Sequence, residues 1–178
     1  MPDLIVLGEL LVEVMRAEVG VPHTAIGAVY KAPYPSGAPA IFASSAARMT
    51  ENTDFKVGYI GVVGDDDFGK VILDKLKKDG VDVSQIRTSE NHTGAAFVQY
   101  NEDGSRNFIF MEGAAGETSP EDVDPLYFHK VKAIHVMGSA LSISESSRNA
   151  VYKMLEAAIE ENNDVEVSFD PNIRPEML

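Results

Sequence analysis

Short apolar runs alternate with helical stretches along this chain, and this alternation limits the fold more than any other feature. Three continuous apolar runs, Leu4–Leu7, Val57–Val63 and Ala133–Met137, are typical of strands that are buried on both faces. Between the first two lies a helix predicted over Ala40–Met49, which Pro39 opens near the N1 position that tolerates proline. Because strand, helix and strand follow one another, we predict a parallel α/β sheet.

A second group of strands does not follow this rhythm. Leu10–Met15 and Ala28–Tyr34 are more polar and irregular, and each is compatible with a strand on an exposed sheet. Gly94–Tyr100 and Asn107–Met111 flank a loop with an Asp-Gly pair at 103–104, which is typical of a β-hairpin. The sequence therefore predicts a small antiparallel sheet beside the parallel one.

Composition restricts the class of protein and its partners. The 178 residues suffice for one domain with a full core, and the formal net charge of −13 argues against nucleic-acid binding. No apolar run approaches the ~18 residues of a membrane helix, and the start at Met1-Pro2-Asp3 has no basic lead, so we expect no membrane association and a cytoplasmic location. Cysteine is absent and the histidines show no metal-ligand spacing, so no metal site is predicted.

Three polar stretches follow predicted strands, at the end of an open α/β sheet where ligands bind. Residues 35–40 combine a glycine with a helix start, which suits a polar ligand, although such turns are usually structural. Residues 65–67, three aspartates, are interpreted first as a helix cap that contributes about 1 kcal/mol and only second as part of a metal site. Residues 170–174 place an acid, an amide and a guanidinium at alternate positions.

Local signals also predict the last helix and strand. Ser142 and Glu145 have the spacing of a capping box, which predicts the start of a helix that ends at Asn162. Val167 and Phe169 alternate with polar residues and are expected to be buried in the final strand. The polar residues 170–174 would then lie just beyond that strand.

Six short motifs are spread over the whole chain, and they are specific in combination. They are Val6-Leu7-Gly8-Glu9, Ser36-Gly37-Ala38-Pro39-Ala40, the stretch from Gly61 to Gly69, the stretch from Leu76 to Asp82, Thr93-Gly94-Ala95-Ala96, and the stretch from Phe169 to Arg174. In content and order they resemble the PfkB, or ribokinase-like, family of carbohydrate kinases.

The resemblance implies a ribokinase-like α/β fold: a doubly wound, mostly parallel sheet, incomplete in this chain, with a small antiparallel β lid. The lid would come from about residues 10–34 and 93–111, which explains the hairpin outside the α/β rhythm. Lids of this kind cover the sugar and often pair with another subunit's lid, so a homodimer is expected. Residues 1–178 would be the N-terminal portion of the domain, without the C-terminal nucleotide-binding part or the catalytic Asp.

The implied reaction transfers the γ-phosphoryl group of ATP to a sugar hydroxyl with Mg²⁺, so the expected partners are a sugar and ATP. Catalysis of this kind depends on positioning and on electrostatic stabilisation of the transferring phosphoryl group. Carried over motif by motif, the substrate-binding residues would be Glu13, Gly37, Ala38, Ile41, Phe97, Gln99, Asp170 and Asn172, and Arg174 would contact the substrate or the transition state. Phe97 and Gln99, on a lid strand, would face either the sugar or the neighbouring subunit.

Two departures from the family pattern bear on the substrate. Ile41 stands where the family's sugar turn usually has Asn, and Glu13 stands where it often has Asp. The form of these motifs resembles the branch that contains tagatose and other ketohexose kinases, so a ketohexose or a related sugar acid is expected. Two alternatives remain at this point: a non-catalytic sugar-binding module, and a structural domain whose sheet edge recruits a partner and forms dimers.

Overall fold

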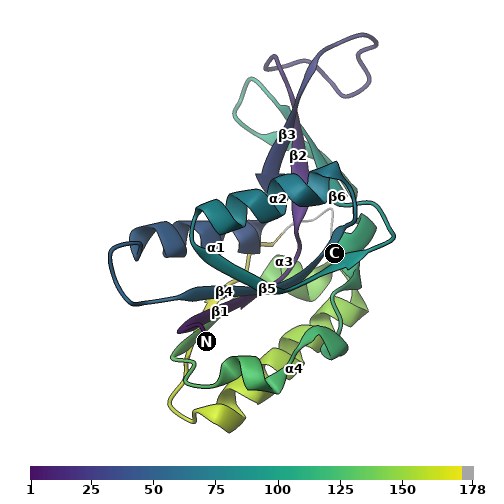
Figure 1. The fold of residues 1–178 in the computed structure, drawn as a ribbon. Coiled ribbons are helices and arrows are strands. Elements are labelled where there is room, and N and C mark those ends of the chain that lie inside the picture. The colour runs from purple at the N-terminus through teal and green to yellow at the C-terminus, as the bar shows by residue number, and fades with distance from the viewer. Residues whose placement is uncertain (174–178) are drawn as a thin grey trace.

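A computed structural model describes residues 1–173, which form a core sheet with helices on both faces and a smaller lid sheet that rises from one end of it (Figure 1). The core sheet is parallel throughout, as the sequence predicts. Its order places β1 in the middle, so the strand order reverses there, as in doubly wound folds. In spatial order its strands are β5 (Val81–Ser89), β4 (Val57–Gly64), β1 (Leu4–Leu7), β8 (Ala133–Met137) and β9 (Glu166–Asp170).

Helices cover both faces of the core sheet, because successive side chains of β1 point to opposite faces and both sets are apolar. Leu4 and Val6 pack in the cluster that faces α1 and α2, whereas Ile5 and Leu7 pack in the cluster that faces α4. The helical segments are α1 (Ala38–Met49), α2 (Asp67–Lys78), α3 (Gly138–Ser142) and α4 (Glu145–Glu161), with the short 3₁₀ segments η1 (Gly113–Glu117), η2 (Pro120–Asp122) and η3 (Pro125–Phe128).

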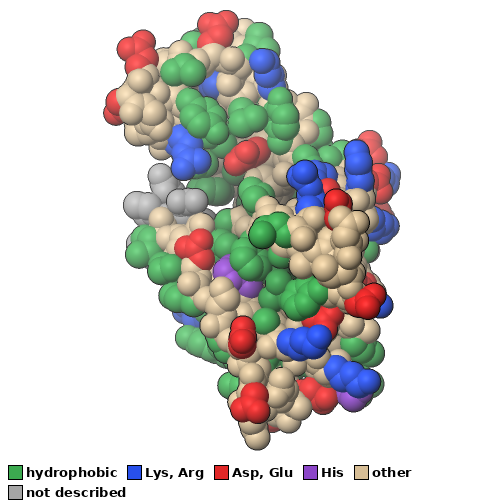
Figure 2. Space-filling view, turned by 90° about the vertical axis from the view of Figure 1, so that its left-hand side faces the viewer, with side chains coloured by type: hydrophobic (Ala, Val, Ile, Leu, Met, Phe, Trp, Pro, Cys, Tyr) green, Lys and Arg blue, Asp and Glu red, His purple; other side chains and the backbone are tan. Residues whose placement is uncertain are grey.

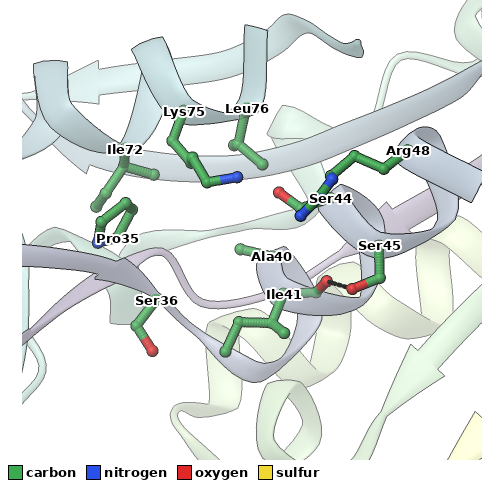
Figure 3. A pocket seen from close by; sticks show the side chains of 10 residues that line it. All are labelled: Pro35, Ser36, Ala40, Ile41, Ser44, Ser45, Arg48, Ile72, Lys75 and Leu76. Atoms are coloured by element: carbon green, nitrogen blue, oxygen red, sulfur yellow. Dashed lines mark hydrogen bonds between the residues drawn. The ribbon is translucent and has the colours of Figure 1, made fainter. Parts of the chain in front are cut away.

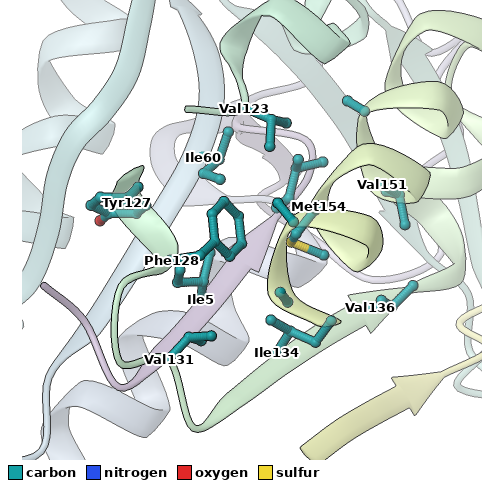
Figure 4. Close-up of a cluster of buried hydrophobic side chains, with 14 of the residues drawn as sticks. Ile5, Ile60, Val123, Tyr127, Phe128, Val131, Ile134, Val136, Val151 and Met154 are labelled. Carbon is teal, nitrogen blue, oxygen red and sulfur yellow. The ribbon is translucent and has the colours of Figure 1, made fainter. Parts of the chain in front are cut away.

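The cluster under α4 shows how these layers are held together (Figure 4). Phe128 from η3 and Met154 from α4 are fully buried against Ile5 and Ile134 of the sheet. Full burial of a side chain of this size contributes about 1.5–3 kcal/mol relative to an exposed one. The core sheet and its helices therefore form one packed layer structure, from which the lid and the loops of the site project.

The lid sheet has the order β3 (Tyr30–Ser36), β2 (Leu11–Arg16), β6 (Gly94–Tyr100) and β7 (Arg106–Met111). The β2–β3 and β6–β7 pairs are antiparallel, as expected, but β2 and β6 run parallel to each other, so the sheet is mixed. In the space-filling view the lid stands as a separate lobe at the top of the molecule (Figure 2).

Three local features differ from the sequence prediction. Helix α4 is capped by Ser144, whose hydroxyl accepts the N–H of Ser147, whereas Ser142 closes α3 by donating to the carbonyl of Gly138. Phe169 is 57% exposed, because β9 pairs with β8 alone among the described residues. Strand β5 is not predicted from the sequence, because its buried residues do not form a continuous apolar run. No helix within residues 1–173 is long and apolar enough to cross a membrane.

Candidate functional site

A cavity of about 140 Å³ lies between the lid sheet and the carboxyl ends of the core strands. It lies at the junction of β3 and α1, under the lid face on which Ala96, Phe108 and Phe110 lie. Its lining residues are Glu9, Leu11, Glu13, Ser36, Gly37, Ala38, Ile41, Ala96, Arg106, Phe108, Phe110, Ser139 and Asn172.

The turn at Gly37 forms one wall of this cavity. Gly37 has a φ of +106°, a conformation that L residues rarely adopt, and a Cβ there would overlap the backbone oxygen of Glu9. Helix α1 begins directly after it, and the Ile41 N–H donates to the Gly37 carbonyl oxygen at 2.9 Å. Glycine therefore allows the helix start, with its positive dipole end, to lie at the cavity.

The lid supplies the opposite wall, and strand register decides which side chains face it. Glu13 of β2 lies beside Ala96 of β6, which in turn lies beside Phe110 of β7. Side chains two residues apart on a strand share a face, so Phe108 and Arg106 continue the same surface. The Arg106 guanidinium carbon lies 5.7 Å from the centre of the Phe108 ring. This wall combines one carboxylate, one cation and two aromatic rings.

A second carboxylate lies at the base of the cavity. Glu9 is only 3% exposed, and the buried hydroxyl of Tyr59 donates to its backbone oxygen at 3.2 Å. Burial and, secondarily, the nearby Glu9 charge raise the pKa of Tyr59 well above its ordinary value, so the phenol keeps its proton. The cavity thus has carboxylates at two depths, the buried Glu9 at its base and the half-buried Glu13 on the lid wall, and the Glu13 oxygens suit the hydroxyl groups of a polar ligand.

The loop after β9 closes the side of the cavity near α3. Asn172 has a φ of +36°, its N–H donates to Oδ1 of Asp170 at 2.9 Å, and its own Oδ1 is buried with no hydrogen-bond partner among the described residues. A Cβ at Gly138 would overlap the backbone oxygen of Pro171, so the loop approaches the start of α3 as closely as the backbone permits. The Ser139 hydroxyl is also buried without a hydrogen-bond partner in the described chain. Two of the residues that line the cavity therefore carry a buried polar oxygen without a hydrogen-bond partner in the described chain.

The base of the lid is tied to the core through Asp66. Its carboxylate caps α2 by accepting the N–H of Gly69 at 2.8 Å, and it also accepts the N–H and the hydroxyl of Thr93, at 2.8 and 2.7 Å. Burial acts to raise the pKa of Asp66, but the hydrogen bonds from Thr93 and Gly69 outweigh it and the pKa is lowered. The cap predicted for the three aspartates is therefore confirmed, with Asp66 as the capping residue.

Five of the predicted substrate-binding residues line the same cavity although they are far apart in the sequence. The turn residues and Glu13 reach it from opposite walls, and the last loop reaches it from the side. These five residues are Glu13, Gly37, Ala38, Ile41 and Asn172.

Three others lie elsewhere. Phe97 is on the opposite face of β6, edge-on to Tyr30 at 5.7 Å, and Gln99 on the same face accepts the N–H of His23 at 2.9 Å. These two side chains lie on the lid face opposite the cavity, because one-residue alternation turns them away when Ala96 points inward. The other branch of the expectation, that they face a neighbouring subunit, stays a prediction. Asp170 holds the turn of the last loop and does not line the cavity. Arg174 lies outside the described residues.

The sequence prediction missed several residues of the cavity, above all Arg106 and Phe108. Their position follows from the hairpin, since Tyr100 pairs with Arg106 and Val98 pairs with Phe108 across the loop. A pairing centred on the Asp103-Gly104 bond would place Tyr100 opposite Asn107, one residue out of register, because the observed pairing is centred on Asp103. The turn signal alone therefore predicts the hairpin but not which side chains face the cavity. Ser139 has no comparable signal, because its place depends on how the loop after β9 packs on α3.

Comparison with known proteins gives one consistent result. The family profile described as "pfkB family carbohydrate kinase" matches residues 1–178. The chain is 35% identical over 144 residues to a fructokinase of Salmonella typhimurium, covering 80% of this chain and 45% of that protein. It is 36% identical over 145 residues to a 5-dehydro-2-deoxygluconokinase of Clostridium botulinum, covering 79% and 41%.

A solved structure matches equally well. The crystal structure of a putative ribokinase II from E. coli in complex with ATP and Mg²⁺ superposes with a TM-score of 0.87 at 38% identity, and the match covers 100% of this chain and 55% of that one. The chain thus spans about half the length of the curated relatives that it matches.

Proposed function

Because the chain belongs to the pfkB family of carbohydrate kinases, we propose that the protein transfers the γ-phosphoryl group of ATP to a hydroxyl of a ketohexose or a related sugar acid. The observation that supports this is the cavity between the Gly37 turn and the lid, in which Glu9, Glu13 and Arg106 lie among apolar side chains. That combination suits a sugar: hydroxyls need oxygen acceptors and donors, while the carbon face packs on aromatic rings.

In this proposal the residues of the chain bind and orient the sugar. Glu13 accepts hydrogen bonds from sugar hydroxyls, and the first turn of α1 directs its positive end toward the same ligand. Phe108 and Phe110 cover the sugar from the lid, and Ile41 replaces a polar contact with hydrocarbon. A covered sugar is shielded from water, which would otherwise compete for the phosphoryl group.

ATP and Mg²⁺ do not fit the donor groups of the described residues. Among residues 1–173 no group of three or more His, Asp or Glu side chains could hold a metal ion. The sequence contains neither a P-loop nor a glycine-rich dinucleotide motif. We therefore assign the sugar side to this chain, and the nucleotide, the metal and the catalytic base to the portion of family members that lies outside its match.

Arg106 bears on which class of sugar is used. It is an exposed cation on the cavity wall, and no ion pair engages it within residues 1–173. An arginine in this position matches a substrate carboxylate bidentately, whereas a neutral ketohexose offers it only hydroxyl oxygens. The names of the relatives cover both classes, since one is a fructokinase and another a 5-dehydro-2-deoxygluconokinase.

A phosphoryl-transfer assay tests the proposal. The protein is incubated with ATP and Mg²⁺ and with fructose, tagatose or 5-dehydro-2-deoxygluconate, and release of ADP is measured. Because only the sugar side is assigned to this chain, we expect residues 1–178 alone to bind the sugar without ADP release, and we expect sugar-dependent ADP release from a protein that joins them to the nucleotide-binding portion of the family. Glu13→Gln should weaken that release, whereas Glu18→Gln, an exposed glutamate of the lid loop, should leave it unchanged. Sugar binding without ADP release by the joined protein would instead support the alternative of a non-catalytic sugar-binding module.

The lid also supports the proposal of a homodimer. Strand β7 is at the edge of its sheet and exposes Ile109 and Met111, at 46% and 57%. An exposed apolar edge strand is a template for pairing with another chain. Sedimentation velocity should show a dimer that Ile109→Lys converts to a monomer; a monomeric parent protein would contradict this. A cytoplasmic location stays a prediction, tested by cell fractionation.

A further inference from the structure

A second cavity lies behind the wall of the sugar pocket. It has a volume of about 170 Å³ and is bounded by α1, α2 and the end of β3 (Figure 3). Apart from the end of β3, it contains none of the lid residues that line the sugar pocket. Its lining residues are Pro35, Ser36, Ala40, Ile41, Ser44, Ser45, Arg48, Ile72, Lys75 and Leu76.

Two cations reach into this cavity from different helices. Arg48 extends from α1 and Lys75 from α2, and their charged ends point toward each other with the Ser44 hydroxyl between them (Figure 3). No ion pair within residues 1–173 engages Arg48, whereas Lys75 pairs with Asp79 at the end of its own helix. The charge of Arg48 also acts on Asp79, so this one carboxylate is shared between the two cations.

The charges around the cavity do not balance. The Asp79 side chain is only 8% exposed; burial acts to raise its pKa, but hydrogen bonds from Lys75 and Ser44 outweigh it, so the pKa is lowered and the carboxylate is ionised. Two cations and one carboxylate leave one positive charge. In a chain with a net charge of −13, such a local excess attracts an anion to this place rather than to the surrounding surface.

The apolar lining residues indicate what the uncharged part of a ligand would be. Ile72 and Leu76 are almost fully buried at the α2 side, and Ala40 and Pro35 close the side of α1 and β3. The exposed apolar surface comes from Ile41, which is 53% exposed, and from the half-buried Pro35, so a short carbon chain can pack on these two side chains while an anionic head reaches the cations. Arginine binds the oxygens of a phosphate with two parallel hydrogen bonds, and lysine adds a point charge.

We propose that this cavity binds a small phosphate ester, with its phosphate on Arg48 and Lys75 and its carbon skeleton on Pro35 and Ile41. We further propose that the occupied cavity changes the affinity of the sugar pocket. Ser36 and Ile41 line both cavities, so they form a common wall on either side of the Gly37 turn. This second part rests on the proposed sugar site, whereas the binding itself does not.

Isothermal titration with glycerol 3-phosphate tests the binding. Glycerol serves as the uncharged probe and inorganic phosphate as the probe without a carbon chain. We expect saturable binding of glycerol 3-phosphate, weaker binding of phosphate and none of glycerol. Arg48→Gln should weaken the binding about tenfold. Lys77→Gln, an exposed lysine of α2 that does not line the cavity, should leave it unchanged.

Absence of saturable binding, or binding that Arg48→Gln does not weaken, would overturn the proposed site. Coupling is tested by measuring the dissociation constant of the sugar with and without saturating glycerol 3-phosphate. Because coupling is reciprocal, a shift in the parent protein must disappear in Arg48→Gln; an unchanged constant in the parent protein would refute coupling alone. Failure of the phosphoryl-transfer assay would refute the proposed function and leave the titration of this cavity interpretable.

Discussion

Replacement of Gly37 by alanine should both destabilise the protein and close the sugar pocket. Gly37 has a φ of +106°, and a side chain held in so sparsely populated a region costs about 1–3 kcal/mol. The added methyl group would also overlap the backbone oxygen of Glu9, and overpacking of this kind costs about 1–3 kcal/mol more. The free energy of unfolding should therefore fall by about 2–6 kcal/mol.

Gly80→Ala separates the two contributions. Gly80 has a φ of +89°, but a Cβ there would meet nothing within 4 Å. Its replacement should cost only the conformational part, about 1–3 kcal/mol, and should leave sugar binding intact because Gly80 follows α2 and lies outside the pocket. The comparison therefore isolates the overlap with Glu9.

Urea unfolding followed by circular dichroism gives both free energies, and calorimetric titration gives the sugar affinity of each folded variant. We expect Gly37→Ala to lose more stability than Gly80→Ala and to lose sugar affinity as well. Equal losses in the two variants, with sugar affinity retained, would refute the argument that the turn at Gly37 needs glycine to shape the pocket.

Three further predictions concern single side chains. Asp66→Asn should weaken the cap of α2 and the bonds to Thr93, lowering the free energy of unfolding by about 1–3 kcal/mol at pH 7, with exposed Asp65→Asn as the control. Because the pKa of Asp66 is lowered by folding, its stabilisation is present above the ordinary value of 3.8 and is lost as the pH falls through the folded pKa; urea unfolding should show less acid sensitivity in Asp66→Asn than in the parent protein. Arg106→Gln should reduce kcat/KM for a sugar acid about tenfold and change that for a neutral ketohexose little, and equal losses would refute a carboxylate contact. Glu13→Gln should raise the KM for the sugar several-fold, measured by ADP release, whereas an unchanged KM would remove Glu13 from the site.

The core of the fold could be predicted because its strands are buried on both faces. Leu4–Leu7 and Ala133–Met137 form β1 and β8 with the predicted bounds, since continuous apolar runs bounded by glycine or polar residues allow few other structures. Strand β5 could not be found this way, because its side chains alternate between buried and exposed environments without a regular period. The exposure of Phe169 depends on which strands are neighbours of β9, and no local pattern contains that information.

Local sequence patterns predict the site only where backbone motifs fix it, and Glu13 and Asn172 follow from the family resemblance instead. Gly37 is recognisable because its backbone conformation excludes other residues, and the Ser-Gly-Ala-Pro turn precedes a helix whichever way the lid lies. The lid residues depend instead on strand register, and a shift by one residue exchanges Ala96 for Phe97 at the cavity. Asn172 enters the cavity because its backbone is left-handed and its loop packs on Gly138, which only the tertiary structure shows.

The most direct test is a crystal structure of the protein with the sugar that gives the highest kcat/KM. We predict that the sugar lies between the Gly37–Ala38 turn and the lid, with hydroxyls within hydrogen-bond distance of the Glu13 carboxylate and its carbon face on Phe108. A sugar bound elsewhere, with this cavity empty at saturating concentration, would contradict the account.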